Sequence, residues 1–131
     1  MRDYKEYTIL DAKAATGEGV AIDVSDFRHL VVEFITDGGG DAALTVKFAG
    51  SIEDTMPSFD SAQALANMFD YIEVVDMQNG SAIDGDTGVS VATADDYRIF
   101  AVNCDGLKWF NAIVTARTAG EVTVKIKAFR D

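Results

Sequence analysis

Apolar and polar residues alternate along most of this chain, in short segments separated by Gly and Asp. In segment 122–128 every second residue is apolar and the residues between are Thr or Lys, and segment 44–48 follows the same pattern. A period of two places one side of an extended strand against a core. Further strand candidates, rich in Val, Ile and aromatic residues, are 4–10, 19–24, 29–36, 71–77, 97–103 and 108–115.

Short segments that contain Gly or Asp separate these strands. Segment 37–41 (DGGGD) offers three glycines that tolerate positive φ angles, and segment 104–107 contains Asp-Gly, a frequent hairpin turn. We therefore expect hairpins at 37–41, 104–107 and 118–121. The last two hairpins share a strand, which predicts an antiparallel meander at the C-terminal end.

Seven or eight strands in 131 residues predict an all-β protein. A two-sheet antiparallel β-sandwich is favoured over one open sheet, because a single sheet would leave one face uncovered. The alternation leaves jelly-roll and immunoglobulin-like strand orders open. One stretch departs from the pattern, since apolar residues of 59–68 lie at helical spacing. This stretch predicts either one short helix or a long loop between the sheets.

The domain organisation follows from the same pattern. We expect a single β-sandwich domain over 17–131, preceded by an N-terminal arm or edge strand over 1–16. The segment 1–16 is rich in charge and short of core residues. We favour an arm that becomes ordered on a neighbouring protein, and we expect its removal to leave the domain folded.

Acidic residues outnumber basic ones two to one. The 22 Asp and Glu against 11 Lys and Arg give a formal net charge of −11. A surface with this charge repels phosphate, so we expect neither nucleic acid nor membrane as a partner. Much of the acid falls in predicted turns, whereas Lys47, Lys125 and Lys127 fall on strand positions predicted to point outward. No apolar run matches a signal peptide or membrane span, which predicts a cytosolic protein or export by a route other than Sec.

Catalytic chemistry has little support in the sequence. A single His (His29) and a single Cys (Cys104) exclude a conventional zinc site and a Cys–His nucleophile pair. The acid pairs Asp37 with Asp41 and 95–96 lie in loop segments, where carboxylates are usually exposed rather than tuned for acid–base work. We therefore expect a protein that is not an enzyme, with no catalytic residues and no cofactor.

The passage 79–88 (NGSAIDGDTG) is the most metal-like in the chain. Calcium takes several oxygen ligands from closely spaced carboxylates and carbonyls, and Asp84 and Asp86 are the candidate ligands. The passage lacks the spacing and the terminal Glu of an EF-hand loop. The alternative is a solvated turn, for which Asn, Asp and Gly have suitable geometry.

Five aromatic residues are candidates for an interface or a ligand site. An exposed flat ring can stack on a sugar, whereas the same rings also fill cores and subunit interfaces. Alternation places neighbouring residues 109 and 110 on opposite faces of one strand, so both interpretations stay open. The five candidates are Phe59, Phe69, Tyr71, Trp109 and Phe110.

A series of short motifs runs through the second half of the chain. They are 70–77 (DYIEVVDM), 84–89 (DGDTGV), 97–103 (YRIFAVN), 105–109 (DGLKW) and 120–124 (GEVTV). In this order the motifs resemble those of small virion proteins of tailed bacteriophages. In that group an aromatic strand leads through a Gly-rich loop to a "vN-dG-l-W" hairpin and a last strand. The similarity covers residues 19–129.

The resemblance implies a non-enzymatic virion structural protein, foremost a capsid decoration or cement protein that coats or stabilises a phage head. Its partners would be other virion proteins, a major capsid protein or a tail component, and further copies in a homo-oligomer such as a trimer. Assembly in the host cytoplasm, where disulfides do not persist, agrees with the lone cysteine. The alternative is a tail, fibre or carbohydrate-binding β-sandwich that recognises a host surface glycan.

Overall fold

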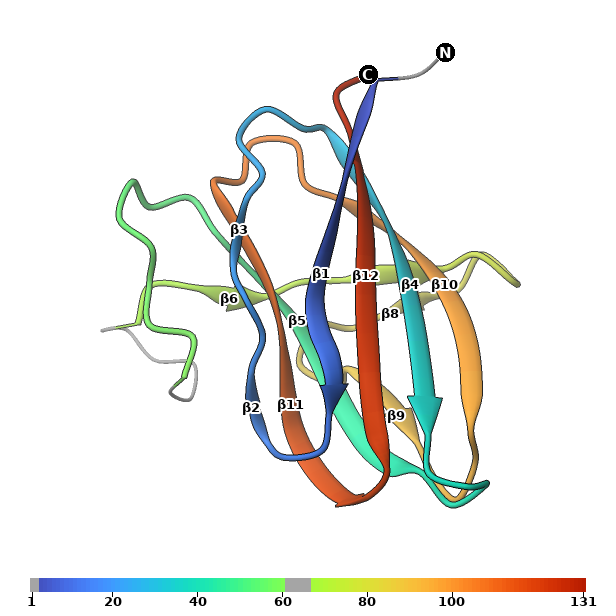
Figure 1. The fold of residues 1–131 in the computed structure, drawn as a ribbon. Helices are drawn as coiled ribbons and strands as arrows, with labels where there is room; N and C mark the ends of the chain where they lie inside the picture. The colour runs from blue at the N-terminus through green and yellow to red at the C-terminus, as the bar shows by residue number, and fades with distance from the viewer. Residues whose placement is uncertain (1–2, 61–66) are drawn as a thin grey trace.

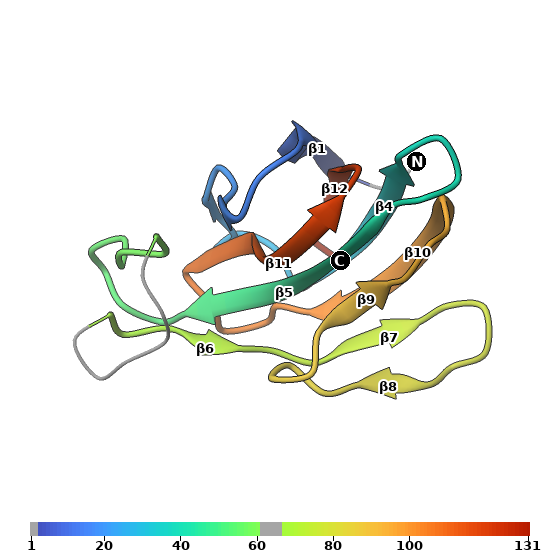
Figure 2. The same ribbon diagram turned by 90° about the horizontal axis from the view of Figure 1, so that it is seen from below.

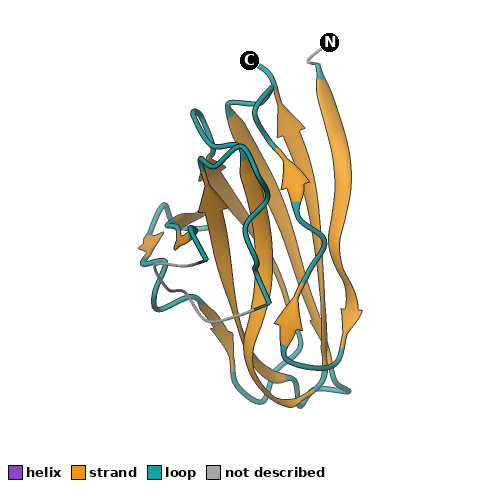
Figure 3. Ribbon diagram, turned by 90° about the vertical axis from the view of Figure 1, so that its left-hand side faces the viewer, coloured by secondary structure: helices purple, strands orange, loops and turns teal. Residues whose placement is uncertain are grey.

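The computed structural model describes residues 3–60 and 67–131 (Figure 1). These residues form strands and loops and no helix (Figure 3). Two antiparallel sheets of six strands each build a sandwich, which confirms the predicted fold class. Most of the short helix expected near 59–68 falls on residues 61–66, which lie outside the described part, and the described residues beside them are not helical.

Sheet A contains four long strands and a short hairpin at one edge. In the long strands β4 and β12 buried residues alternate with partly buried or exposed ones, as a period of two requires. In spatial order the strands of sheet A are β1 (Tyr4–Lys13), β12 (Glu121–Phe129), β4 (His29–Asp37), β10 (Asp96–Asn103), β7 (Val74–Asp76) and β8 (Ala82–Ile83).

Sheet B is built around two long neighbouring strands. These are β11 (Trp109–Ala119) and β5 (Ala43–Ser51), which pair along most of their lengths. Short strands complete both edges. Beside β11 lie β2 (Gly17–Glu18) and β3 (Ile22–Asp23), and beside β5 lie β6 (Asp70–Tyr71) and β9 (Val89–Val91).

The long strands change sheet each time the chain reverses. β4 lies in sheet A, β5 in sheet B, β10 in sheet A, β11 in sheet B and β12 again in sheet A. The order β1-β12-β4-β10 opposite β2/β3-β11-β5-β6 is that of a jelly roll. An immunoglobulin-like sandwich differs from this order, because several of its consecutive strands share a sheet.

Three expected hairpins are therefore corners between the sheets. Segment 37–41 joins β4 to β5, 104–107 joins β10 to β11, and 118–121 joins β11 to β12. In each case the two strands belong to different sheets, so the predicted C-terminal meander is wrong. Turn residues show that the chain reverses, but they do not decide whether the next strand pairs with the last one or crosses to the other layer.

Close backbone contacts hold two of these corners together. Gly120 has a φ of +84°, and a Cβ atom there would lie 2.8 Å from the Cβ of Ala42. The carboxylate of Asp95 accepts hydrogen bonds from the N–H groups of Gly38 and Gly40, each at 2.8 Å. This acid, one of the paired carboxylates considered above, thus fixes the glycine corner.

The predicted strand 71–77 is divided between the sheets. Its first residue belongs to β6 in sheet B, and β7 follows in sheet A. Figure 2 shows β6 and β7 in succession, passing from the side of β5 to the side of β10. A single apolar run therefore contributes to both layers.

The described part of segment 1–16 forms the edge strand β1. It pairs with β12 from Tyr4 beside Phe129 onward, and register shifts on both sides of Leu10 turn Ile9 and Leu10 into the core. Their side chains are 2% and 1% exposed. In this single chain the segment takes the edge-strand alternative, and the bulge hides two core residues from a period-two pattern.

Four phenylalanines link the two sheets in the main core. The ring centroids of Phe34 and Phe100 of sheet A lie 5.9 Å apart. The ring centroid of Phe48 of sheet B lies 6.3 Å from that of Phe100 and 6.0 Å from that of Phe110. Cys104 is also buried in this core, where burial raises its thiol pKa to about 11. Cys104 is therefore a core residue.

Candidate functional site

The five candidate aromatic residues divide between two places. Phe110 is 0% exposed and stacks on Phe48 in the main core, so its ring is inaccessible in the single chain. Phe59, Phe69, Tyr71 and Trp109 gather instead on the outer face of sheet B, where they form a second apolar cluster with Ala49, Ala21 and Ile113.

This second cluster is covered by the connection between β5 and β6. We call its described residues, 52–60 and 67–69, the strap; it is seen at the left of Figure 1. Phe59 and Phe69 of the strap are buried, with ring centroids 5.0 Å apart, and Phe69 meets Tyr71 edge to face at 5.7 Å. The strap thus covers outward-pointing residues of sheet B, including Ile113.

Hydrogen bonds fasten the strap at both ends. The Trp109 indole donates to the carbonyl of Glu53 at 3.0 Å, and the Ser51 hydroxyl donates to the carbonyl of Met68 at 2.8 Å. The Nζ atom of Lys108 lies 5.5 Å from the Trp109 ring. A sugar platform needs a freely exposed ring face, whereas Trp109 is half-buried in this cluster.

Asp84 and Asp86 lie in the loop between β8 and β9. The Asp84 carboxylate accepts hydrogen bonds from the N–H groups of Asp86 (2.7 Å) and Thr87 (3.4 Å). The Asp84 carbonyl accepts another from Gly88 at 3.0 Å. Within residues 3–60 and 67–131, no group of three or more His, Cys, Asp or Glu is arranged to hold a metal ion. The contacts of Asp84 are those of a turn.

Two ion pairs fix the borders of the sheets. Asp76 of β7 accepts a 2.7 Å hydrogen bond from Arg98, which, with the N–H of Gln78, lowers the Asp76 pKa. Asp23 of β3 accepts a 2.8 Å bond from Lys108, and this bond is the main cause that lowers the Asp23 pKa from 3.8 to about 2. Each carboxylate has a structural partner.

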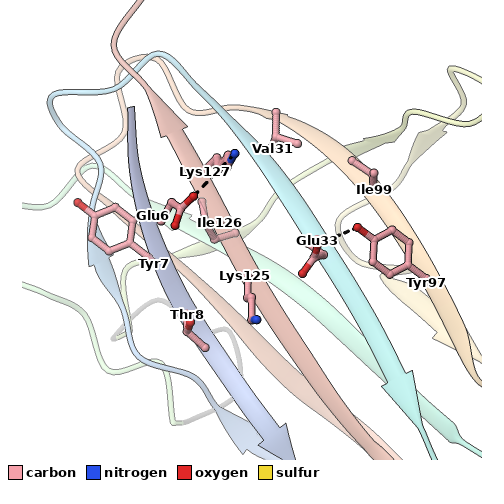
Figure 4. Close-up of a pocket in the computed structure, with 10 residues that line it drawn as sticks. All are labelled: Glu6, Tyr7, Thr8, Val31, Glu33, Tyr97, Ile99, Lys125, Ile126 and Lys127. Carbon is pink, nitrogen blue, oxygen red and sulfur yellow. Dashed lines mark hydrogen bonds and ion pairs between the residues drawn. The ribbon is translucent and has the colours of Figure 1, made fainter. Parts of the chain in front are cut away.

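A shallow groove lies on the outer face of sheet A, the opposite side of the molecule from the strap. Its volume is about 580 Å³, and it crosses β1, β12, β4 and β10 (Figure 4). A second hollow beside β7 shares Tyr97 and Ile99 with it. The groove is lined by Glu6, Tyr7, Thr8, Val31, Glu33, Tyr97, Ile99, Lys125, Ile126 and Lys127.

Two pairs of polar side chains meet in the groove. The Tyr97 hydroxyl donates to Glu33 at 2.7 Å, and this bond raises the Tyr97 pKa. Lys127 lies 3.7 Å from Glu6 and 4.8 Å from the ring centroid of Tyr4. Figure 4 shows the apolar side chains of Val31 and Ile99 near each other, outside these two pairs. The face combines exposed apolar groups with matched charges.

None of the groove's apolar residues was among the sequence candidates. The available signal was segment 30–35, in which both alternating faces are apolar except at Glu33. Strands that are apolar on both faces are usually covered on both. In this protein the second face of the strand is left partly exposed.

The remaining observations concern the molecule beyond the groove. Among the described residues, no helix is long and apolar enough to cross a membrane. No family model and no curated protein matches the chain.

Two solved structures share the fold. The SPBc2 prophage-derived protein YomS aligns over 98% of this chain and 94% of its own, with a TM-score of 0.70 and 18% identity. The PBSX exported protein XepA aligns over 97% of this chain but only 38% of its own, with a TM-score of 0.72 and 18% identity. The same β-sandwich is therefore found nearly entire in one prophage-derived protein and as part of a larger exported one.

Proposed function

We propose that this chain is a non-enzymatic structural protein of a bacteriophage particle. The observation that carries the proposal is that its whole fold recurs in a prophage-derived protein, YomS. The phage-like motifs between residues 70 and 124 support the same assignment independently of the fold. Both point to a protein that works through its surfaces.

The finer proposal is a decoration or cement protein of the phage head. The acidic surface supports this role, because a chain of charge −11 does not compete for the packaged genome and stays soluble before assembly. Its partners would be the major capsid protein and further copies of itself in a closed oligomer, where modest contacts are multiplied by symmetry.

The carbohydrate-binding alternative has less support. Its best candidate, Trp109, lies in the cluster under the strap, and its indole N–H is already bonded to Glu53. A glycan array with the purified chain tests this alternative directly. Specific binding that is lost in Trp109→Ala, but kept in a groove variant such as Ile99→Ser, would favour it over the particle role.

The particle role is tested on particles made by the phage that encodes this chain. Particles are purified on a density gradient, and the chain is located by immunogold electron microscopy. We expect label on the heads. Label on tails or fibres would overturn the decoration role and keep the structural one, whereas a chain present in lysates but absent from purified particles would overturn both.

A further inference from the structure

The two outer faces of the sandwich differ in what covers them. The outer face of sheet B carries the strap, which buries Phe59 and Phe69. No described segment packs over the outer face of sheet A, as Figure 1 shows. Sheet A therefore presents a broad surface made mostly of strand residues.

This surface exposes several apolar side chains, although a sheet face that contacts only water can consist of polar residues. Ile99 is 38% exposed, Tyr97 57% and Met77 56%, and Val31 is half-buried beside Ile99. These residues lie on the neighbouring strands β4 and β10 and just beyond the end of β7. Contiguous exposed apolar groups within a polar rim are characteristic of protein interaction sites.

The charges of this face identify the kind of partner. The charged residues that line the groove are two acids, Glu6 and Glu33, and two bases, Lys125 and Lys127, so the groove has a net charge of zero (2 − 2). The whole chain has a net charge of −11. The groove is thus a neutral area on a strongly acidic protein.

We infer that the outer face of sheet A is the surface on which a second copy of this chain docks. Two chains of charge −11 repel each other, and they can approach closely only where neither presents net charge. Two sheet faces also pack well against each other, with interdigitating side chains, as the two layers of this sandwich already do. Each copy would cover Ile99 and Val31 of the other.

Other partners fit this face less well. A basic protein would be attracted to the acidic loops rather than to the neutral groove. An acidic partner of another kind would meet the same face, but only a second copy is certain to carry the same two acids and two bases, Glu6, Glu33, Lys125 and Lys127, for pairing across a two-fold axis. An isologous contact of this kind uses one patch twice.

Salt dependence distinguishes a contact between like-charged copies. Raising ionic strength from about 0.01 M to about 0.15 M shortens the Debye length from roughly 30 Å to roughly 8 Å. Screening weakens the long-range repulsion between the copies more than the short-range contacts in the groove. We expect the dimer Kd, measured by sedimentation equilibrium of the full chain, to fall roughly tenfold over this range.

Charge variants assign the contact to the face. Lys125→Glu/Lys127→Glu changes the groove from zero to −4, and we expect the Kd at about 0.15 M salt to rise at least roughly tenfold. The matched control is Lys5→Glu/Lys47→Glu, which gives the chain the same net charge of −15 (−11 − 4) at two residues that do not line the groove. Ile99→Ser, which changes no charge, should weaken the dimer as well.

This inference rests on the proposed function and deepens it, because it assigns the face through which the proposed homo-oligomer forms. The outcomes of the experiments distinguish the inference from the function. A chain that is monomeric at every salt and at about 0.1 mM, far above a micromolar Kd, would overturn the inference. So would equal effects of the groove and control variants, once circular dichroism shows that both are folded. Absence from particles would overturn the function and leave the dimer intact.

Discussion

The outer faces of the two sheets differ in whether the chain covers their apolar residues. On sheet B the chain covers its own outward residues, since the strap places Phe59 and Phe69 over Ile113 and leaves them 3% and 7% exposed. On sheet A the equivalent strand positions stay open, with Ile99 38% and Tyr97 57% exposed. The first face therefore contributes to folding, and the second is available for assembly.

The largest test of this difference is removal of residues 1–16, which takes β1 from the edge of sheet A. Burial of Ile9 and Leu10 stabilises the fold by about 3–6 kcal/mol together, against about 5–15 kcal/mol for a typical domain. We expect the truncated chain to lose most or all of its cooperative unfolding transition in urea. This reverses the expectation from sequence that the remaining domain would stay folded.

A shorter truncation serves as the control for that experiment. Among the described contacts, removing residues 1–3 deletes the exposed Asp3–Arg130 ion pair and the 3.4 Å hydrogen bond from the Arg130 N–H to the Asp3 carbonyl. This truncation should cost less than about 1 kcal/mol. If the chain without residues 1–16 unfolds at the wild-type urea midpoint, β1 is a detachable arm. The open sheet would then end at β12.

The next test compares the two faces directly. Phe59→Ala removes a buried ring from the cluster under the strap, and we expect a loss of about 3 kcal/mol in the free energy of unfolding. Ile99→Ala removes apolar atoms from the open face and should cost less than about 0.5 kcal/mol. Both are measured by urea unfolding at low salt and low protein concentration, where the proposed dimer is dissociated. Equal losses would mean that the faces do not differ.

Alternation of apolar and polar residues encodes the strands but not their neighbours. A period of two identifies which residues of 122–128 enter a core, and it predicted the sandwich. It does not encode which strand lies beside β12, so the sequence predicts a hairpin at 118–121 where the structure has a corner between the sheets. That choice depends on contacts between distant segments, such as β12 with β4.

The faces were harder to predict than the strands. Trp109 and Ile113 on sheet B and Val31 and Ile99 on sheet A are all apolar residues at outward positions. Whether such a position is covered depends on a long connection folding back, and the sequence of the strap did not specify which face it would cover. The groove was missed for this reason, and the bulge at Leu10 hid the core residues of β1.

A smaller effect is expected for the hydrogen bond that fastens the strap. Trp109→Phe removes the donor to the Glu53 carbonyl and should cost about 1 kcal/mol. The matched variant on the open face is Tyr97→Phe, which removes the donor to Glu33 and should cost less than about 0.5 kcal/mol, because Tyr97 is exposed. Far-UV circular dichroism follows both unfolding curves, since Trp109 is the protein's single tryptophan. A larger loss in Tyr97→Phe would contradict the stronger fastening of the covered face.

The smallest effect concerns the Asp23–Lys108 pair, which joins β3 to the start of β11 at the border of sheet B. Because the Asp23 pKa is about 2 in the folded chain, against 3.8 for an unperturbed Asp carboxyl, its contribution is present above pH 3.8 and is lost as the pH falls toward 2. The Asp23 side chain is 44% exposed, so the pair contributes less than about 1 kcal/mol. Asp23→Asn should therefore lower stability at neutral pH and match the wild type near pH 2. Urea unfolding across this pH range measures the difference, which should vanish when Asp23→Asn is made in a Lys108→Met background. A difference that persists without Lys108 would show that Asp23 acts through Ser25 and its own turn rather than by joining β3 to β11.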